Sequence, residues 1–523
     1  MKTPCDELVM RSGQPSTVTT AASGPWILAA TILGSSMAFI DGTIVNVAVP
    51  KLQSAFQATV VDVQWVIESY GLLLASLILA GGALGDWLGR RFTFLLGVGV
   101  FAVASAACGM APSIQALIIA RAVQGIGAAL LVPGSLAIIG ASFDESSRGR
   151  AIGTWSGFTA ITTALGPVLG GWLIEYASWR WAFFLNLPLA AAVIVISLRH
   201  VPESCRSQGL NQKSTARLDW LGSSIATAGL AGVVTGLLES SKLGWRSPVV
   251  SGGLVGGLLL FVLFVWVEAR ASSPMVPLAL FKSNAFLGAN LLTLLLYSAI
   301  GIFFFLFPVT LMQVHHYSAT AAGAASLPVP LLMFSLSRWS AGLVAGHGGK
   351  IPLMIGPLVV AAGFVLFAKA SHSGSYWKTF FPAVVTLGFG MAITVAPLTT
   401  VVMSSVSKDH SGAASGINNA VARLAGVLAI AVFGIVLVKT FASHLDRVLP
   451  TLPLSSEVVH EIRAKEIELA GMELPNNLDE SAGNMARTAV SEAFLSSFRL
   501  VLFFCAALSV GSALVALRLI PKK

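Results

Sequence analysis

The sequence predicts an all-α integral membrane protein whose chain crosses a bilayer fourteen times. Of its 523 residues, 55% are hydrophobic and only 11% are charged, and the mean hydropathy is +0.82. Soluble domains carry about a quarter charged residues, so this chain cannot cover itself with polar surface. A soluble enzyme, a disordered protein and a secreted disulfide scaffold are excluded. The four cysteines lie far apart without metal-site spacing, and we expect neither a metal nor a cofactor.

Apolar runs long enough to cross a bilayer, about 20 residues each, recur along the chain. They lie at 26–48, 63–83, 92–111, 113–141, 150–174, 181–200, 218–238, 248–269, 285–312, 318–345, 351–370, 377–403, 411–442 and 495–519. Residues 1–25 are polar and lack an apolar core followed by a small-residue cleavage site. We therefore expect a short cytoplasmic tail there, not a signal peptide.

The distribution of basic residues predicts the orientation. With fourteen spans and the N-terminus inside, the inner segments hold seventeen Lys and Arg residues and the short outer loops hold six. Basic residues concentrate in cytoplasmic loops of membrane proteins. We expect a multi-pass protein of the cell (inner) membrane with both termini in the cytoplasm.

Two polar segments interrupt the apolar pattern. Residues 201–217 form a basic linker after the sixth span, which suggests a boundary between two six-helix halves. Residues 443–494 contain nine acids against four bases and fall on the outer side. Within them, the cap Ser455 and apolar residues at helical spacing over 455–469 predict a short amphipathic helix. A solvated acidic face without a specific role is the alternative for this loop.

Few charged residues are candidates for a place inside the bilayer: Asp41, Glu68, Arg121 and Arg423 within their spans, and Arg338 at the inner end of the tenth span. Each costs at least about 2.5–3.5 kcal/mol at mid-bilayer and needs a partner or a role. We interpret Arg121 as a switchable partner of a protonatable acid; a fixed counter-ion is the alternative. Asp41 and Glu68 are expected at similar depth, close enough to share a pocket. One would carry a proton, with Asp41 the stronger candidate; alternatively, Asp41 bonds its helix end and Glu68 faces water.

No sequence for nucleotide-driven transport is found. The nearest string to a phosphate-binding loop ends at Gly349 and Lys350, without the required glycine before or hydroxyl after. This leaves a secondary transporter or a channel.

Four strings in order resemble one family. They are 40–50 (IDGTIVNVAVP), 82–91 (GALGDWLGRR), 121–129 (RAVQGIGAA) and 165–171 (LGPVLGG). With them, the chain resembles the major facilitator superfamily, and within it the fourteen-helix drug–proton antiporter branch (EmrB/QacA type). The resemblance implies two six-helix bundles, 26–200 and 285–519, with two helices of 218–269 inserted between them. Substrate would bind between the bundles, whose rocking alternates access.

The resemblance also implies roles for particular residues. The residues expected to gate the conformational change are Gly82, Asp86, Gly89, Arg90 and Arg91. The antiporter motif consists of Gly166, Pro167, Gly170 and Gly171, in a bent and closely packed helix. The residues expected to line the substrate cavity are Asn46, Gln124, Asn418, Asn419 and Arg423.

Two physical expectations accompany these roles. Asp86 would face the N-terminus of a neighbouring helix, where a carboxylate is favoured. Gly82, Gly85 and Gly89 would let helix backbones approach closely.

The expected function is export of amphipathic drugs or toxic compounds, some of them cationic, in exchange for protons. The protein would not be an enzyme, and the proton gradient would replace any cofactor. Alternatives are a dedicated exporter of one natural product, a proton symporter on the same fold, and an uncoupled channel, which the charged residues disfavour. Besides substrate, protons and lipid, a periplasmic adaptor protein docking on 443–494 is a possible partner; nucleic acid is not.

Overall fold

The computed structural model describes residues 23–204, 219–271, 274, 276–369, 375–406, 411–472, 474 and 478–522, and their regular structure is helical. The first group of helices comprises α2 (Gly24–Phe56), α3 (Val60–Leu88), α4 (Arg90–Gly109), α5 (Ile114–Ser142), α6 (Glu145–Tyr176), α7 (Trp181–Phe184) and α8 (Asn186–His200). A pair follows, α9 (Trp220–Leu243) and α10 (Pro248–Glu268). The last group comprises η1 (Leu278–Lys282), α11 (Asn284–Gln313), α12 (Ala319–Ala324), α13 (Pro328–His347), α14 (Lys350–Ala368), α15 (Tyr376–Thr379), α16 (Phe381–Ser404), α17 (Ser411–Val448), η3 (Leu449–Thr451), α18 (Ser456–Ala464), η4 (Glu466–Gly471) and α19 (Glu480–Leu519).

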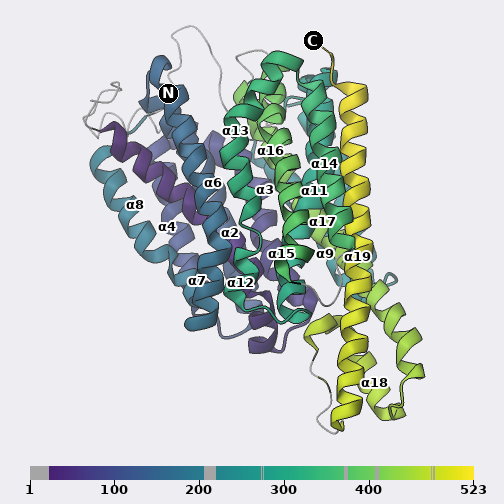
Figure 1. Ribbon diagram of the computed structural model, residues 1–523. Coiled ribbons are helices and arrows are strands. Elements are labelled where there is room, and N and C mark those ends of the chain that lie inside the picture. The colour runs from purple at the N-terminus through teal and green to yellow at the C-terminus, as the bar shows by residue number, and fades with distance from the viewer. Residues whose placement is uncertain are drawn as a thin grey trace.

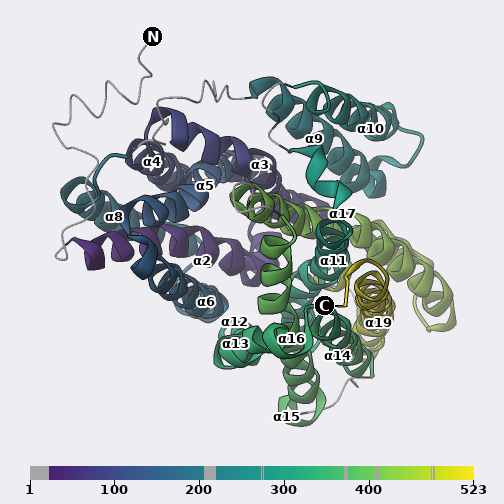
Figure 2. The same ribbon diagram turned by 90° about the horizontal axis from the view of Figure 1, so that it is seen from above.

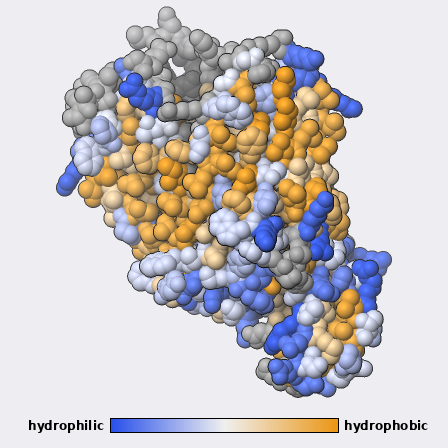
Figure 3. Space-filling view, in the orientation of Figure 1, coloured by the Kyte–Doolittle hydropathy of each residue, from blue (hydrophilic) through white to orange (hydrophobic). Residues whose placement is uncertain are grey.

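Fourteen stretches of the described chain are helical, long and apolar enough to cross a membrane, as the sequence predicts. The short α7 continues into α8 as one span, and α12 continues into α13 as another. Figure 3 shows hydrophobic side chains across the middle of one face, with hydrophilic residues gathered toward the ends. The prediction of an all-α, fourteen-span membrane protein is confirmed.

The helices pack in two groups with a pair beside them. In the first group, residues 24–200, which we call the N-half, α2 packs on α6 and α8, while α5 packs on α3 and α4. In the last group, residues 278–519, which we call the C-half, α11 packs on α17 and α19, and α14 packs on α16 and α19. The inserted helices α9 and α10 pack on each other, and α9 touches both α3 and α17 (Figure 2).

Both ends of the described chain lie at one end of the molecule, which we call the terminal end; the opposite end, near α7 and α12, is the distal end (Figure 1). The predicted tail 1–25 and linker 201–217 lie mostly outside the described residues.

The helices that contain the last two predicted spans are longer than those spans. α17 has 38 residues and α19 has 40, so at 1.5 Å per residue they are about 57 and 60 Å long. A bilayer core needs about 30 Å, and both helices project beyond the distal end (Figure 1). Much of 443–494 is therefore helical, because apolar packing continues outside the span.

The predicted amphipathic helix in this projection is confirmed. α18 begins after Ser455, whose side chain accepts a hydrogen bond from the backbone N–H of Val458. Val458 and Ile462 are buried on one face. The following turn, η4, packs on α17 and α19 and also touches α2 and α3 of the N-half.

Candidate functional site

A buried ion pair joins α2 and α5 inside the N-half. The guanidinium of Arg121 donates from Nη1 to Oδ2 of Asp41, and each side chain is 1% exposed. A charge removed from water needs a partner of opposite charge. Each of the two side chains therefore supplies the partner that the burial of the other requires. The two charges that the sequence places in separate spans meet here.

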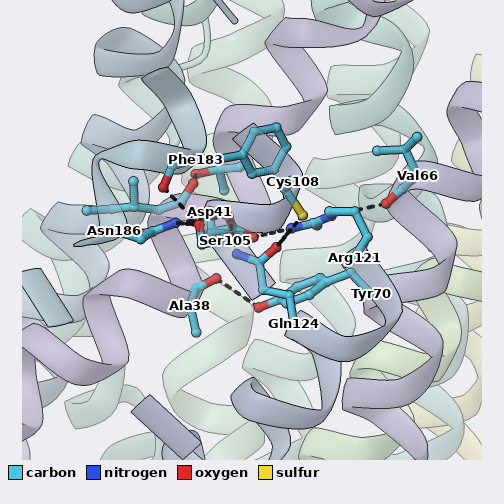
Figure 4. A network of polar contacts seen from close by, with 12 residues as sticks. Ala38, Asp41, Val66, Tyr70, Ser105, Cys108, Arg121, Gln124, Phe183 and Asn186 are labelled. Carbon is cyan, nitrogen blue, oxygen red and sulfur yellow. Dashed lines mark hydrogen bonds and ion pairs between the residues drawn. The ribbon is translucent and has the colours of Figure 1, made fainter. Parts of the chain in front are cut away.

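Two amides complete the coordination of Asp41 (Figure 4). Gln124 Nε2 donates to Oδ1 of Asp41 at 2.8 Å, while its Oε1 accepts from Arg121 Nη1 at 2.8 Å. Asn186, at the start of α8, donates to the same Oδ1 at 3.2 Å and to Oγ of Ser105 at 2.9 Å. Ser105 in turn donates to the backbone carbonyl of Phe183 at 2.8 Å. The carboxylate thus has three donors from two helices.

Arg121 is also held by α3. Its Nε donates to the carbonyl oxygen of Val66 at 3.1 Å, and the guanidinium carbon lies 4.2 Å from the centre of the Tyr70 ring. The Tyr70 hydroxyl donates to the carbonyl oxygen of Ala38 in α2 at 3.2 Å. The polar network therefore joins α2, α3, α4, α5, α7 and α8.

The structure brings together three predicted residues, Asp41, Arg121 and Gln124. Gln124 was expected to line a substrate cavity, but it is 0% exposed and both ends of its amide are bound within the network. Sequence reasoning missed Asn186, although a lone amide in the apolar run 182–195 is itself a signal. It also missed Tyr70, whose ring lies against Arg121.

Glu68 does not belong to this network. At 100° per residue, it points about 160° away from Tyr70, whose ring faces Arg121. Within the described part of the chain, neither carboxylate oxygen of Glu68 has a hydrogen-bond partner, and the residue is 1% exposed. The expectation that Asp41 and Glu68 share a pocket is wrong: Asp41 of α2 pairs with Arg121 on the side of α3 that Tyr70 faces, whereas Glu68 points to the opposite side of α3.

At the terminal end of α3, the gating residues form two ion pairs. Asp86 accepts from Arg90, one turn later, at 3.1 Å, and Arg90 also reaches the carbonyl of Ala137 in α5. The expectation that Asp86 faces the N-terminus of a neighbouring helix stays a prediction; among the described residues, the first backbone N–H groups of α4 are bonded to a different acid. This acid is Glu203, which the sequence analysis missed.

Glu203 caps α4. Its carboxylate accepts from the backbone N–H groups of Arg91 and Phe92 at 2.9 and 3.0 Å, beside the Arg91 side chain. Burial raises the pKa of the Glu203 carboxyl, against the hydrogen bonds and the cation that favour its charged form. Gly89 is required here, since its φ is +112° and a Cβ would lie 2.7 Å from Oε1 of Glu203.

The expected close approach at Gly82 and Gly85 is wrong. A Cβ at either would meet nothing nearer than 3.7 Å, whereas one at Gly81 would lie 2.0 Å from the carbonyl oxygen of Ala129. α3 and α5 therefore touch through Gly81, because this residue, not its neighbour, faces α5.

The antiporter motif on α6 makes two kinds of close contact. Cβ atoms at Gly166 and Gly170 would collide with Thr43 and Ile44 of α2. A Cβ at Gly171 would lie 2.3 Å from the carbonyl oxygen of Ala319 in α12. From the other side, a Cβ at Gly323 would lie 2.0 Å from the carbonyl oxygen of Pro167.

The motif therefore joins the two halves at backbone contact near the distal end. Gln313 of α11 also donates to Gln53 of α2 at 2.9 Å.

Among the described residues, none of the remaining predicted cavity residues is hydrogen-bonded to the network. Asn418 donates to Asn290 and Thr293 of α11 at 3.2 and 2.7 Å. Asn419 is exposed and donates to its own helix. Arg423 is partly buried and lies 5.9 Å from the ring of Phe39 in α2, across the two halves. Asn46 lies in α2 and is half-buried.

Fourteen apolar spans, twelve in two groups and two in the inserted pair, with an ion pair buried inside one group, define the class: a multi-pass membrane protein of transporter architecture. The family model of the Major Facilitator Superfamily matches residues 31–430. The chain belongs to this superfamily, and it is not an enzyme.

Several curated relatives are similar over most of the chain. The multidrug resistance protein Stp of Mycobacterium tuberculosis is 34% identical over 83% of this chain and 80% of its own. The tetracenomycin C resistance and export protein of Streptomyces glaucescens is 32% identical over 96% of this chain and 94% of its own. The methylenomycin A resistance protein of Bacillus subtilis is 32% identical over 80% and 88%.

Solved structures agree on the fold. A bacterial homolog of the human lysosomal transporter Spinster, in an inward-facing and unoccupied conformation, has a TM-score of 0.64 at 16% identity, covering 95% of this chain and 98% of that one. The inward-open xylose transporter XylE of E. coli has a TM-score of 0.57 at 13% identity, covering 95% and 96%.

Proposed function

We propose that this protein exports amphipathic drugs or toxic compounds across the cell (inner) membrane in exchange for protons. The observation that carries the proposal is the buried pair of Asp41 and Arg121 with its two amide partners. The names of the relatives, which are resistance and export proteins, support the export direction.

The ion pair supplies a physical basis for coupling. When Asp41 takes up a proton, Arg121 loses its only carboxylate partner within the described residues. Breaking a buried pair from one side costs about 3–5 kcal/mol, enough to change which conformation is favoured. Protonation of Asp41 would thus loosen the network that joins these helices, and the return of the charge would restore it.

The sidedness follows from the charge distribution. Basic residues predominate at the terminal end, which we assign to the cytoplasm. The backbone contacts of α6 with α12 and the bond between Gln53 and Gln313 then close the outer side. Export would require these contacts to part after substrate has entered from the cytoplasm. The distal projection is the surface on which an adaptor protein would dock.

The test measures proton release on adding substrate to purified protein, together with dye accumulation in cells with and without a protonophore. Export should fail when the proton gradient is dissipated. Asp41→Asn should release no proton, and Glu68→Gln serves as the matched acid-to-amide control. Proton release by Asp41→Asn at the wild-type level would refute coupling through this pair, and export that survives the protonophore would refute proton drive.

A dedicated exporter of one natural product is the second candidate. It is favoured by the tetracenomycin C protein, which aligns with almost the entire chain. A resistance screen in a host without its own pumps separates the two. Protection against several unrelated compounds supports drug export, whereas protection against a single compound supports the dedicated exporter.

A further inference from the structure

Glu68 lies where α3, α9 and α17 meet, and so where the N-half, the inserted pair and the C-half adjoin. It is one turn from Trp65 and from Leu72, which belong to one apolar cluster with Leu230 and Val234 of α9 and with Val427 and Ala431 of α17. We call this cluster the three-helix seam.

The antiparallel packing of α3 on α17 fixes what faces Glu68. A Cβ at Gly434 would touch the Gln64 amide, and one at Gly71 would lie 3.0 Å from Cγ2 of Val427. Glu68 falls between these contacts, opposite the middle of 427–434. Residues 424–438 of α17 are uniformly uncharged and apolar or glycine. This stretch of α17 therefore offers Glu68 no counter-ion.

The charged groups that α9 and α17 bring to the edges of the seam are engaged elsewhere. Glu239 of α9 accepts from Trp65 Nε1 at 2.8 Å, and Lys242 of α9 pairs with Asp62 at 2.8 Å. On α17, Lys439 lies 5.3 Å from the ring of Trp245, and Arg423 lies against Phe39. An unpaired carboxylate in such surroundings is very costly, and a neutral carboxyl group would be the less costly form of Glu68 while the seam is packed.

A second unpartnered group lies one turn away. Gln64 is 2% exposed, and its Nε2 has no hydrogen-bond partner among the described residues. Positions i and i+4 are neighbours on a helix, and an amide there can donate to a carboxylate. The contact with Gly434 turns this amide toward α17 in the packed seam. Parting α17 from α3 would free it to stabilise an ionised Glu68.

We infer that Glu68 and Gln64 form a proton-binding latch, separate from the Asp41–Arg121 pair, that lets the distal side close only when Glu68 is protonated. Glu68 lies eight residues into α3 from its distal end, about 12 Å along the helix. Its proton therefore exchanges with the distal compartment when the seam parts. This inference rests on the alternating access of the proposed function, but not on which acid couples transport.

Linkage sets the direction of the pH effect. The state that binds more protons is favoured at low pH, so acid on the distal side favours closure. With an inward proton gradient, the latch would speed the return of the emptied transporter.

Distances between spin labels at Ser54→Cys and Lys378→Cys test the latch. Both residues are exposed near the distal end, one in each half, and Cys5 and Cys205 are first replaced by serine. In the wild-type background the fraction with long distances should rise with pH. Glu68→Gln should lose this pH dependence and keep the short distance, while still releasing protons on substrate addition. Gln64→Leu should lower the long-distance fraction at high pH, and the control Glu239→Gln should behave as wild type.

Three results would overturn the latch: an unchanged pH dependence in Glu68→Gln, loss of substrate-induced proton release in that variant, or a Gln64→Leu variant indistinguishable from wild type. Asp41→Asn should keep the pH-dependent distances while losing proton release. Absence of proton release from wild-type protein would refute the proposed function, and the distance measurement would still decide the latch.

Discussion

Arg121 has three different kinds of partner, and only a guanidinium fits them together. Its Nη1 serves Asp41 and Gln124, its Nε reaches the carbonyl of Val66, and its flat face lies over Tyr70. A lysine ammonium is a single point charge on a flexible stem and lacks the planar fork. The contacts of Arg121 therefore require an arginine at this position.

Arg121→Ala should abolish gradient-driven transport while still inserting into the membrane. It leaves Asp41 buried without its cation, which costs about 3–5 kcal/mol, so transport should fall more than about tenfold. Arg121→Lys should recover little. Everted-vesicle transport of a fluorescent substrate measures this, with the exposed Arg447→Ala as control. Normal transport by Arg121→Ala would remove this residue from the coupling mechanism.

At the scale of helices, α6 shows how small residues determine which conformations are available. Its distal part touches α12 at backbone distance, through Gly171 on one side and Gly323 on the other. Helix backbones approach this closely only where no Cβ intervenes. The motif is thus a surface on which the two halves close.

Gly171→Leu should prevent the distal side from closing and so stop transport, because its side chain would overlap the backbone of Ala319. Gly153→Leu is the matched control, since a Cβ at Gly153 has nothing within 4 Å and lies on the same helix. Transport by both variants is compared at equal membrane abundance. If Gly171→Leu transports as well as Gly153→Leu, the α6–α12 contact is not needed for the cycle.

The capping of α4 gives a prediction about stability. Glu203→Ala leaves two backbone donors of the first turn without their carboxylate, and loss of a helix cap costs about 0.5–2 kcal/mol. The apparent melting temperature in detergent should therefore drop. The exposed Glu457→Ala should leave it nearly unchanged. Equal melting of both variants would show that the α3–α4 connection does not depend on this cap.

The two ends of the molecule differ in charge and in how far their helices extend. The terminal end carries both ends of the described chain, whereas the distal end carries the projection of α17, α18 and α19 (Figure 1). The assignment of the terminal end to the cytoplasm rests on where basic residues concentrate.

A membrane-impermeant thiol reagent should label Glu457→Cys in intact cells and should label Lys522→Cys only after the membrane is opened. Both positions are exposed, one on α18 and one beyond α19. Labelling of Lys522→Cys in intact cells would invert the topology and, with it, the assigned direction of transport.

The sequence by itself determined the class, the number of spans and the helix in the distal loop. These depend on composition and periodicity along the chain, which a bilayer enforces locally because every backbone group there must be hydrogen-bonded within its own helix. It also identified Asp41 and Arg121, since charge in an apolar run stands out against its neighbours.

Only the tertiary structure decided which of these residues meet. Asn186 and Glu203 act on groups 145 and 112 residues away, and no local pattern encodes such a separation. Gly81 and Gly82 are neighbours in sequence but point in directions 100° apart, and this decides which of them makes the close contact with α5. Glu68 and Tyr70 are two residues apart, and this places Glu68 on the side of α3 away from the ion pair. The facing of a helix is fixed by its packing partners, because in an almost uniformly apolar span the sequence leaves that rotation nearly undetermined.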